Sequence, residues 1–404
     1  MSPSDAKPTP VPFEAARLGP LTLRNRVIKA ATFEGVMPRG QVTPELIDFH
    51  VRVARGGAAL STVAYCAVSK GGRVSRDTMV MTPNMVGDLT RLTAAVQAEG
   101  AKISAQLGHA GLVAQAHNRR NPSLAPSTRF SAPATGVIRA ATREDLDQVV
   151  SDFTAATTVA IEAGFDAVEV HIGHNYLLSS FLSPNLNHRR DEFGGSIENR
   201  ARFPRRVLEA VRKVADGRIA VIAKLNMADG VERGLWLSES LQFAKLFESD
   251  GTLDAIQLTG GSSLLNGMYY FRGDVPLREF AEAQGPLIGL GVRAYGRRIF
   301  PKLPFEEAFF LPFARQFRRE LDIPLILLGG INELSTINSA VADEGFEFVA
   351  MARALLREPD LVNRFERNHQ SAGICVHCNK CMPTIYTGTR CVLVDSHPSI
   401  APAR

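Results

Sequence analysis

The segment VEVHIGHNYLLSSFLSP carries two histidines and a tyrosine close together, His171, His174 and Tyr176. The apolar run before His171 is typical of a buried strand, so all three side chains would follow one strand end. Two imidazole N–H groups can hold and polarise a carbonyl oxygen, and a phenol can deliver a proton. A lone histidine is usually a core or surface residue, but three polar aromatic side chains on one loop favour a catalytic site.

Polar residues also end other apolar runs. Gln106 lies in QLGHAG and Lys224 lies in KLN. A planar amide and a cation suit a heterocycle with an amide-like edge that gains negative charge. Taken singly, either residue is more often an ordinary polar residue of the core.

Two later runs end in LLGGI, with Gly329 and Gly330, and in MARAL, with Ala352 and Arg353. Glycine N–H groups can approach a phosphate closely, and an arginine can bind it through two hydrogen bonds. A Gly-Gly turn is weak evidence by itself. Together with an arginine at the next strand end, it indicates a phosphate site.

Four of the five cysteines lie in ICVHCNKCMPTIYTGTRCVL, with the spacing C-x2-C-x2-C-x9-C: Cys375, Cys378, Cys381 and Cys391. Thiolates this close could converge on one metal centre, either an iron–sulfur cluster or zinc. Inert or redox-sensitive thiols are the alternative. Five cysteines in 404 residues are too few for a secreted disulfide scaffold.

One rhythm repeats along the chain, a short apolar run, a polar or glycine-rich break, and then an amphipathic helix. The predicted strands are 26–32, 59–66, 102–108, 167–173, 219–226, 255–261, 324–330 and 346–352. The predicted helices are 44–55, 85–99, 144–163, 197–215, 238–249, 305–320 and 334–343. Eight such units predict an α/β fold of the closed (β/α)8 TIM-barrel type rather than an open doubly wound sheet.

Long inserts over 109–142 and 262–304 follow the third and sixth strands, where βα loops of a barrel shape the active face. The second insert contains GLGVRAYGRRIFPKLPF, a basic, glycine-rich stretch suited to a mobile lid. We expect the barrel to end near residue 370 and a short tail to follow.

Composition excludes several classes. Apolar residues make up 45% and charged residues 22%, as in ordinary globular chains, and no apolar run is long enough to cross a bilayer. The start MSPSDAKPTPVPFE has no apolar stretch, so we expect no signal peptide and a cytoplasmic location. With 46 basic and 41 acidic residues and no aromatic residues within the arginine clusters, nucleic-acid binding is not favoured.

Several blocks resemble the old yellow enzyme family of NADH:flavin oxidoreductases. The central block is HIGHNYLLSSFLSPNLNHRRDEFGGSIENRARFPRRVLEAVR over 171–212, and LRNRVIKAATFEG (23–35), QLGHAG (106–111), LGGI (328–331) and MARALLREPDL (351–361) follow the family order. The resemblance spans about residues 12–365 and implies an FMN-binding barrel over 1–370, with an N-terminal hairpin and a cysteine-rich tail over 371–404 packed on it.

The resemblance implies roles at matching positions. His171 and His174 would hold the substrate carbonyl, and Tyr176 would protonate the alkene carbon next to it after hydride transfer. The flavin would contact Gln106 and Lys224, the first-strand residues Ala31 and Thr32, the second-strand residue Cys66, and, through its phosphate, Gly329, Gly330, Ala352 and Arg353.

Two positions depart from the family pattern, and a third has an alternative interpretation. Phe33 stands where the family often carries a threonine or cysteine beside the flavin, unless Thr32 takes that role after a one-residue shift. The usual Gly-Arg of the phosphate site is Ala352-Arg353 here. Cys66 is equally consistent with a plain core thiol.

The segment that carries the four cysteines, 375–391, resembles the tail of relatives such as trimethylamine dehydrogenase and 2,4-dienoyl-CoA reductase, which binds a [4Fe–4S] cluster. The spacing between the last two cysteines is shorter here. The resemblance implies an FMN-dependent NAD(P)H oxidoreductase of the ene-reductase type, acting on a small enone, quinone or other electrophile. The alternative is a flavin dehydrogenase or demethylase that passes electrons through the cluster to a separate acceptor. Neither nucleic acid nor membrane is an expected partner, and homo-oligomer formation stays open.

Overall fold

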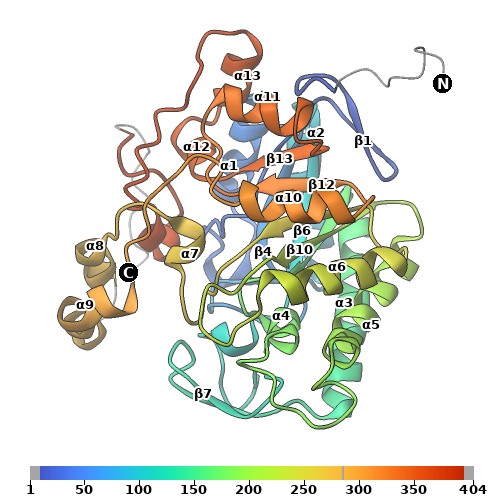
Figure 1. The fold of residues 1–404 in the computed structure, drawn as a ribbon, viewed down its shortest axis with the longest axis vertical. Coiled ribbons are helices and arrows are strands. Elements are labelled where there is room, and N and C mark those ends of the chain that lie inside the picture. The colour runs from blue at the N-terminus through green and yellow to red at the C-terminus, as the bar shows by residue number, and fades with distance from the viewer. Residues whose placement is uncertain (1–9, 284–285, 395–404) are drawn as a thin grey trace.

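The computed structural model describes residues 10–283 and 286–394. Its centre is a parallel barrel whose first strand pairs with both the last and the second, which closes the ring (Figure 1). The eight strands are β3 (Val27–Lys29), β4 (Leu60–Ala67), β6 (Lys102–Gly108), β9 (Ala167–Ile172), β10 (Ala220–Asn226), β11 (Ala255–Thr259), β12 (Leu325–Leu328) and β13 (Phe348–Met351). The short strand β5 (Met79–Val80) extends the sheet beside β4. The (β/α)8 prediction is therefore confirmed.

Helices surround the barrel and follow the predicted ranges closely. They are α1 (Pro44–Arg55), α2 (Val86–Ala98), α3 (Arg143–Glu162), α5 (Ile197–Ala215), α6 (Leu237–Ser249), α10 (Leu311–Glu320) and α11 (Leu334–Ala342). Helix α10 starts six residues later than predicted. The apolar residues before it, Phe309 and Phe310, instead lie against Gly330 and Gly329 at the end of β12.

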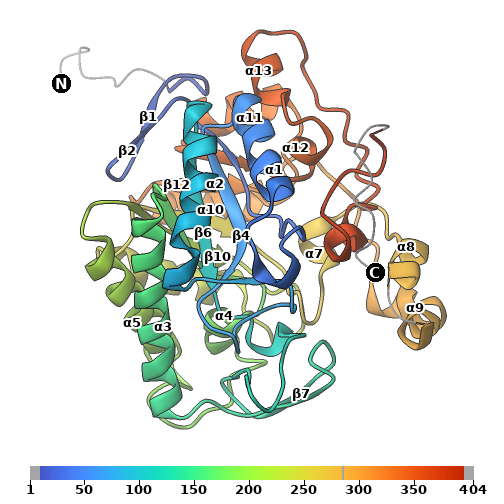
Figure 2. The same ribbon diagram turned by 180° about the vertical axis from the view of Figure 1, so that it is seen from behind.

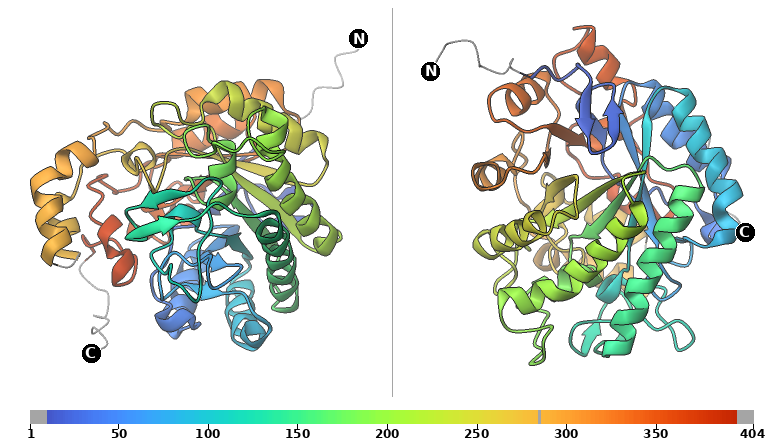
Figure 3. Two further views of the ribbon diagram at one scale, coloured as in Figure 1. Left: turned by 90° about the horizontal axis from the view of Figure 1, so that it is seen from below. Right: turned by 90° about the vertical axis from the view of Figure 1, so that its right-hand side faces the viewer.

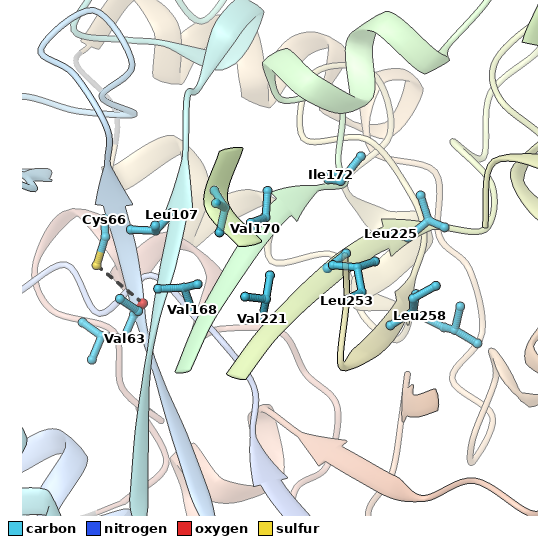
Figure 4. Close-up of a cluster of buried hydrophobic side chains, with 14 of the residues drawn as sticks. Val63, Cys66, Leu107, Val168, Val170, Ile172, Val221, Leu225, Leu253 and Leu258 are labelled. Atoms are coloured by element: carbon cyan, nitrogen blue, oxygen red, sulfur yellow. Dashed lines mark hydrogen bonds between the residues drawn. The ribbon is translucent and has the colours of Figure 1, made fainter. Parts of the chain in front are cut away.

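Two hydrophobic layers hold the barrel. Inside it, small and branched side chains such as Ile28, Ala167 and Ile222 form a cluster with the hairpin β1 (Ala16–Leu18) and β2 (Leu21–Leu23), which caps one end (Figure 3). The predicted N-terminal hairpin is thus present. The outer layer, between strands and helices, contains larger aliphatic residues, and Figure 4 shows Val63, Leu107 and Val168 among them.

The two inserts fold differently. The first contains the 3-10 turn η3 (Gly111–Val113) and the hairpin β7 (Arg129–Ser131) and β8 (Gly136–Ile138). The second contains α7 (Met268–Phe271), α8 (Leu277–Ala283) and α9 (Pro286–Ile299). The stretch predicted as a mobile lid is largely helix α9, which packs on α8 at the side of the molecule (Figures 1 and 2). The lid interpretation stays a prediction.

The tail returns to the barrel through backbone hydrogen bonds. Ser371 accepts from the Leu334 N–H, and the Thr389 N–H donates to the carbonyl oxygen of Glu34. The short 3-10 helix η4 (Met382–Tyr386) packs beside α8. Residues 395–404 of the predicted tail and 1–9 of the N-terminal stretch lie outside the described residues. Within the described ranges, no helix has the length and apolar character needed to span a membrane.

Candidate active site at the barrel mouth

A polar layer lies inside the barrel below its carboxyl-terminal rim. Its centre is Glu169 on β9, which is 1% exposed. The Glu169 carboxylate accepts hydrogen bonds from Gln106 Nε2 (2.6 Å), Gln257 Nε2 (2.9 Å) and Lys224 Nζ (3.1 Å). Buried charges are tolerated when they are paired and hydrogen-bonded. The layer therefore places Gln106 and Lys224 on neighbouring sides of one carboxylate.

The predicted catalytic residues converge one layer above. The ring centroids of His171 and His174 are 5.1 Å apart, and those of His171 and Tyr176 are 4.5 Å apart. Tyr65 joins them with its ring 5.4 Å from that of Tyr176. The three residues that the sequence singled out thus share one site with a tyrosine that it did not.

The turn after β9 explains this convergence. His171 points into the barrel because it is two residues beyond Glu169 on the same strand. His174 and Asn175 then adopt positive φ angles of 59° and 60°, which reverse the chain sharply. The His174 N–H donates to Asn226 Oδ1 at 3.0 Å, which fixes the turn to β10. Tyr176 follows directly before the short helix α4 (Leu177–Leu182).

Burial sets the protonation of these groups. Desolvation and the nearby Lys224 charge lower the pKa of His174 to about 3 and that of His171 well below its usual value. Burial raises the pKa of the Tyr176 phenol. At neutral pH the site therefore offers two neutral imidazoles and a protonated phenol, which suit hydrogen-bond polarisation and proton donation.

The second insert contributes the site's other wall. Tyr270 stacks on His174 with 4.6 Å between ring centroids, and its hydroxyl lies 3.1 Å from Ser263 Oγ. His174 Nε2 lies 3.0 Å from Thr259 Oγ1 at the end of β11. These contacts hold the His174 ring between a strand end and the insert.

The end of β3 also faces the mouth. Ala31 and Phe33 are half-buried and pack against Tyr65. Thr32 lies between them, and its Oγ1 accepts a hydrogen bond from Lys29 Nζ at 2.8 Å. The predicted contacts of Ala31 and Thr32 with a cofactor stay predictions, since no ligand is present, but both residues border the site.

Cys66 does not border the site. It is fully buried in the outer hydrophobic layer, and its Sγ faces the Val63 carbonyl oxygen at 3.8 Å (Figure 4). The pairing of β4 with β6 shifts register between Val63 and Cys66, which breaks the alternation of side chains along β4. That irregularity turns Tyr65 toward the site and Cys66 away from it. The pocket-lining interpretation of Cys66 is corrected to that of a core thiol.

Of the predicted phosphate site, the structure shows the glycine turn but not a free Arg353 side chain. Gly329 and Gly330 adopt positive φ angles of 119° and 80°, which a side chain would strain. Arg353, however, directs its guanidinium to the carbonyl oxygen of Arg272 (3.0 Å) and to Asn379 Oδ1 in the tail. A phosphate contact from the Arg353 side chain is therefore still a prediction, as is one from Ala352.

Arg272 is a second cation at this end that the sequence did not single out. Its guanidinium lies 4.7 Å from the ring centroid of Phe309, and Phe309 packs against Gly330. The buried Nε of Arg272 has no hydrogen-bond partner within the described part of the chain.

The four tail cysteines do meet. Cys375, Cys378, Cys381 and Cys391 line one cavity with Arg353. Burial raises the pKa of Cys381 to about 12 and raises that of Cys375 as well. No group of three or more His, Cys, Asp or Glu side chains among residues 10–283 and 286–394 is arranged to hold a metal ion. The metal centre thus stays a prediction.

The mouth fits a polar aromatic ligand. His171 Nδ1 and the Tyr65 hydroxyl are buried without a hydrogen-bond partner in the described ranges, so they are free to bind one. Amide and ammonium groups of Gln106 and Lys224 lie just below them. This donor set is compatible with a flavin ring, and the fold and site together define a TIM-barrel oxidoreductase.

Comparison with known proteins gives the family. The profile of the NADH:flavin oxidoreductase / NADH oxidase family matches residues 12–258, more than half of the chain. The chain is 65% identical over 389 residues to the 4,4'-dithiodibutanoate disulfide reductase of Rhodococcus erythropolis, covering 96% of each protein. It therefore belongs to this family, as the resemblance predicted.

More distant relatives differ in length. The metal reductase of Desulforamulus reducens is 31% identical over 376 residues, which are 93% of this chain but only 52% of that protein. A solved 2-naphthoyl-CoA reductase shares the fold with a TM-score of 0.76 at 20% identity, over 93% of this chain and 58% of its own. Morphinone reductase aligns with a TM-score of 0.68 at 24% identity, over 90% and 92% of the two chains.

Glu169 and Tyr65 escaped the sequence reasoning for different reasons. Glu169 had a usable signal, because it precedes His171 by two residues within a strand and must share its face. Tyr65 had none, because its orientation depends on the register shift in β4.

Proposed function

We propose that the chain is an FMN-dependent NAD(P)H oxidoreductase that reduces a small electrophile at the barrel mouth. The observation that carries this proposal is the convergence of His171, His174 and Tyr176 above the buried Lys224. Family membership supports it, since the matching profile describes flavin oxidoreductases. Bound FMN would supply the hydride chemistry, with NAD(P)H as the reductant.

The chain's own residues would hold the flavin at both ends. Gln106 would bond its polar edge, and Lys224 would stabilise negative charge on the reduced ring. Gly329 and Gly330 offer backbone N–H groups for the phosphate, and Arg272 is a nearby cation whose Nε has no hydrogen-bond partner among the residues that the structure describes.

The neutral imidazoles would orient the substrate. A carbonyl oxygen held by His171 and His174 becomes polarised as negative charge develops on it. Tyr176, kept protonated by burial, would then give its proton to the carbon next to that carbonyl. The imidazoles and the phenol thereby have separate tasks, and each task can be removed by its own substitution.

The decisive experiment separates the two half-reactions of Tyr176→Phe by stopped-flow absorbance. We expect reduction of an enone to slow by about 10²–10⁴-fold, while flavin reduction by NAD(P)H stays nearly unchanged. Tyr295→Phe is the matched control, because Tyr295 is an exposed tyrosine on α9. Equal losses in both half-reactions would remove Tyr176 from its role, and a protein that takes up no FMN would end the proposal.

A second candidate substrate is an organic disulfide, favoured by the 65% identity to a disulfide reductase along the whole alignment. NAD(P)H and one proton would convert a disulfide RSSR into two thiols RSH and NAD(P)+. Tyr176, which burial keeps protonated, would give its proton to the departing sulfur, so that the second half of the disulfide leaves as a thiol and not as a thiolate.

The two substrates can be ranked directly. Steady-state rates with 4,4'-dithiodibutanoate and with a simple enone are measured on one preparation of known FMN content, and thiols are titrated. Two thiols released for each NAD(P)H oxidised, at the higher kcat/KM, would select the disulfide. Faster enone turnover with no thiol release would reject it.

The cysteine cavity suggests a third possibility, in which electrons pass through an iron–sulfur cluster to a separate acceptor. The support is that the four thiols line one cavity beside Arg353. A cluster distributes its thiolates over several irons. Iron and acid-labile sulfide analysis of anaerobically purified protein tests this. Absence of both would exclude the route.

A further inference from the structure

Two loops at the carboxyl-terminal end of the barrel carry positive charge almost without acidic residues. The loop after β4 (68–80) and the first insert (109–142) together contain seven lysine or arginine residues and one acidic residue, Asp77. The loop after β10 (227–236) has one basic and two acidic residues. The first insert lies at the end of the barrel opposite the hairpin of β1 and β2 (Figures 1 and 2). The excess of positive charge is thus local to one side of the mouth, and the function proposed above gives it no task.

Backbone hydrogen bonds join these two loops into one surface. The Ala110 N–H donates to the Gly72 carbonyl oxygen at 2.8 Å, and the Gln115 N–H donates to that of Val74 at 2.7 Å. Val74 also packs against the apolar cluster that contains the site residue Tyr65. The joined loops therefore form one wall of the mouth.

Five exposed or half-buried cations carry the charge of this wall, and we call them the basic rim: Lys70, Arg73, Arg76, Arg119 and Arg120. None of them forms an ion pair with another residue of the described ranges, in contrast to Arg139 of the same insert, which pairs with Asp145. The Asp77 carboxylate accepts from the Arg39 N–H at 2.8 Å. The rim thus presents positive charge that no carboxylate of the described chain contacts.

Arg73 is held in place although no carboxylate binds it. Its Nε donates to the Lys70 carbonyl oxygen at 3.1 Å, and its Nη1 donates to that of Arg76 at 3.3 Å. A guanidinium has five N–H donors in a planar fork, so two bonds to its own loop leave the others for a ligand. A carboxylate is a group that fits such a fork.

We propose that the basic rim is a binding site for a carboxylate, so that the substrate is an anionic electrophile whose reacting group enters the mouth while its charged end stays at the rim. The inference rests on the proposed function and narrows it to substrates with a carboxylate. Unpaired charges of one sign raise the local concentration of an oppositely charged molecule, and salt screens this attraction. The disulfide considered above belongs to this class, because a dibutanoate carries two carboxylates, whereas a simple enone carries none.

The test compares substrates that differ only in charge, 4,4'-dithiodibutanoate and its dimethyl ester. kcat/KM for each is measured with the FMN-loaded wild type in about 10 mM and about 150 mM salt. We expect a preference for the dicarboxylate that falls as salt is raised, with no salt dependence for the ester. An enone with a remote carboxylate is compared with its methyl ester in the same way, so that the result does not depend on which electrophile is reduced.

Two variants remove charge from the rim. Lys70→Gln with Arg73→Gln acts in the loop after β4, and Arg119→Gln with Arg120→Gln acts in the first insert, where both side chains are exposed. Each variant should reduce the ratio of kcat/KM for the dicarboxylate to that for the ester by about tenfold at low salt.

The matched control is Arg17→Gln with Arg218→Gln. Both arginines are exposed, each donates to a backbone carbonyl oxygen of its own segment, and they lie on β1 and directly before β10, at the other end of the barrel. This control removes the same charge from the molecule as either rim variant, so it should leave the ratio unchanged.

Other results overturn the inference. Equal kcat/KM for the charged and the neutral substrate at low salt would do so, as would rim variants that behave like the control. Rim variants that weaken only NAD(P)H binding in the reductive half-reaction would assign the rim to the phosphates of the nicotinamide cofactor instead. If the variant of the β4 loop fails to fold, the variant of the first insert decides. A wild type that takes up no FMN would defeat the proposed function together with this inference, whereas normal turnover without a preference for charge would defeat the inference alone.

Discussion

The barrel mouth and the cysteine tail both gather reactive side chains, but they do so by different means. At the mouth, Glu169, His171 and Lys224 sit on regular parallel strands and are almost fully buried. In the tail, four cysteines spread over 375–391 line one cavity, and η4 is the regular element of that segment. The mouth is therefore positioned by the barrel, whereas the tail depends on individual turns and contacts.

The difference predicts how the order of each region would depend on a bound group. The mouth's polar groups already bond one another through Glu169. The thiols of Cys375 and Cys381 have raised pKa values, so they stay protonated at neutral pH until something displaces the protons. Metal binding to thiolates supplies folding free energy in such segments. We expect the mouth to be ordered in the apoprotein and the tail to gain order with its ligand.

The largest expected effect is the loss of stability when a charge is removed from the polar layer below the mouth. Lys224→Met leaves Glu169 buried without its cation and should lower the free energy of unfolding of the apoprotein by about 3–5 kcal/mol. Urea denaturation measures this. Lys245→Met is the control, because the exposed Lys245–Glu320 pair at 2.8 Å should contribute about 1 kcal/mol or less. Similar losses in both variants would mean that the polar layer has no special importance for stability.

A smaller effect concerns the tail. If the tail binds a metal centre as proposed, Cys381→Ser should make 371–394 sensitive to limited proteolysis while the barrel's unfolding temperature changes by only a few degrees. Mass spectrometry of the fragments locates the cuts. Cys66→Ser is the matched control, since Cys66 lies in the core and far along the chain from the cysteine cavity. Identical digestion of wild type and Cys381→Ser would show that the tail is ordered without a ligand.

The smallest effect concerns pH. Burial lowers the pKa of His109, beside the mouth, from 6.5 to about 4, and its Nδ1 accepts from the Gly111 N–H at 3.2 Å. The folded state thus holds His109 neutral, while the unfolded state protonates it below 6.5. Stability from this group is complete above that value and is lost as pH falls toward about 4, by about 2–3 kcal/mol between about pH 7 and pH 4.5.

Urea denaturation across that pH range tests the prediction. The free energy of unfolding that is lost between about pH 7 and pH 4.5 should be smaller in His109→Gln than in the wild type, by about 2–3 kcal/mol. Replacing the exposed His188 by glutamine should leave the pH dependence unchanged. Parallel curves for wild type and His109→Gln would contradict the assignment.

The sequence by itself determined the barrel and the core of its site. Eight apolar runs at β/α spacing must pair in parallel and close, and residues at their ends then meet at one rim. His171, His174, Tyr176, Gln106 and Lys224 were found this way because strand ends converge whatever the loops do. The four cysteines were also found, since their spacing is local.

Only the tertiary structure decided the rest. A register shift in β4 turned Tyr65 toward the site in place of the expected Cys66, and no local pattern encodes such a shift. The Arg353 guanidinium donates to Asn379 Oδ1 in the tail and to the carbonyl oxygen of Arg272 in the second insert, two acceptors that lie far away in the sequence. The contact of Lys29 with Thr32 depends on the space between β3 and α1, where burial forces the ammonium to find a partner. Strand periodicity is a property of neighbours in sequence, whereas these choices follow from packing among residues that the fold brings together.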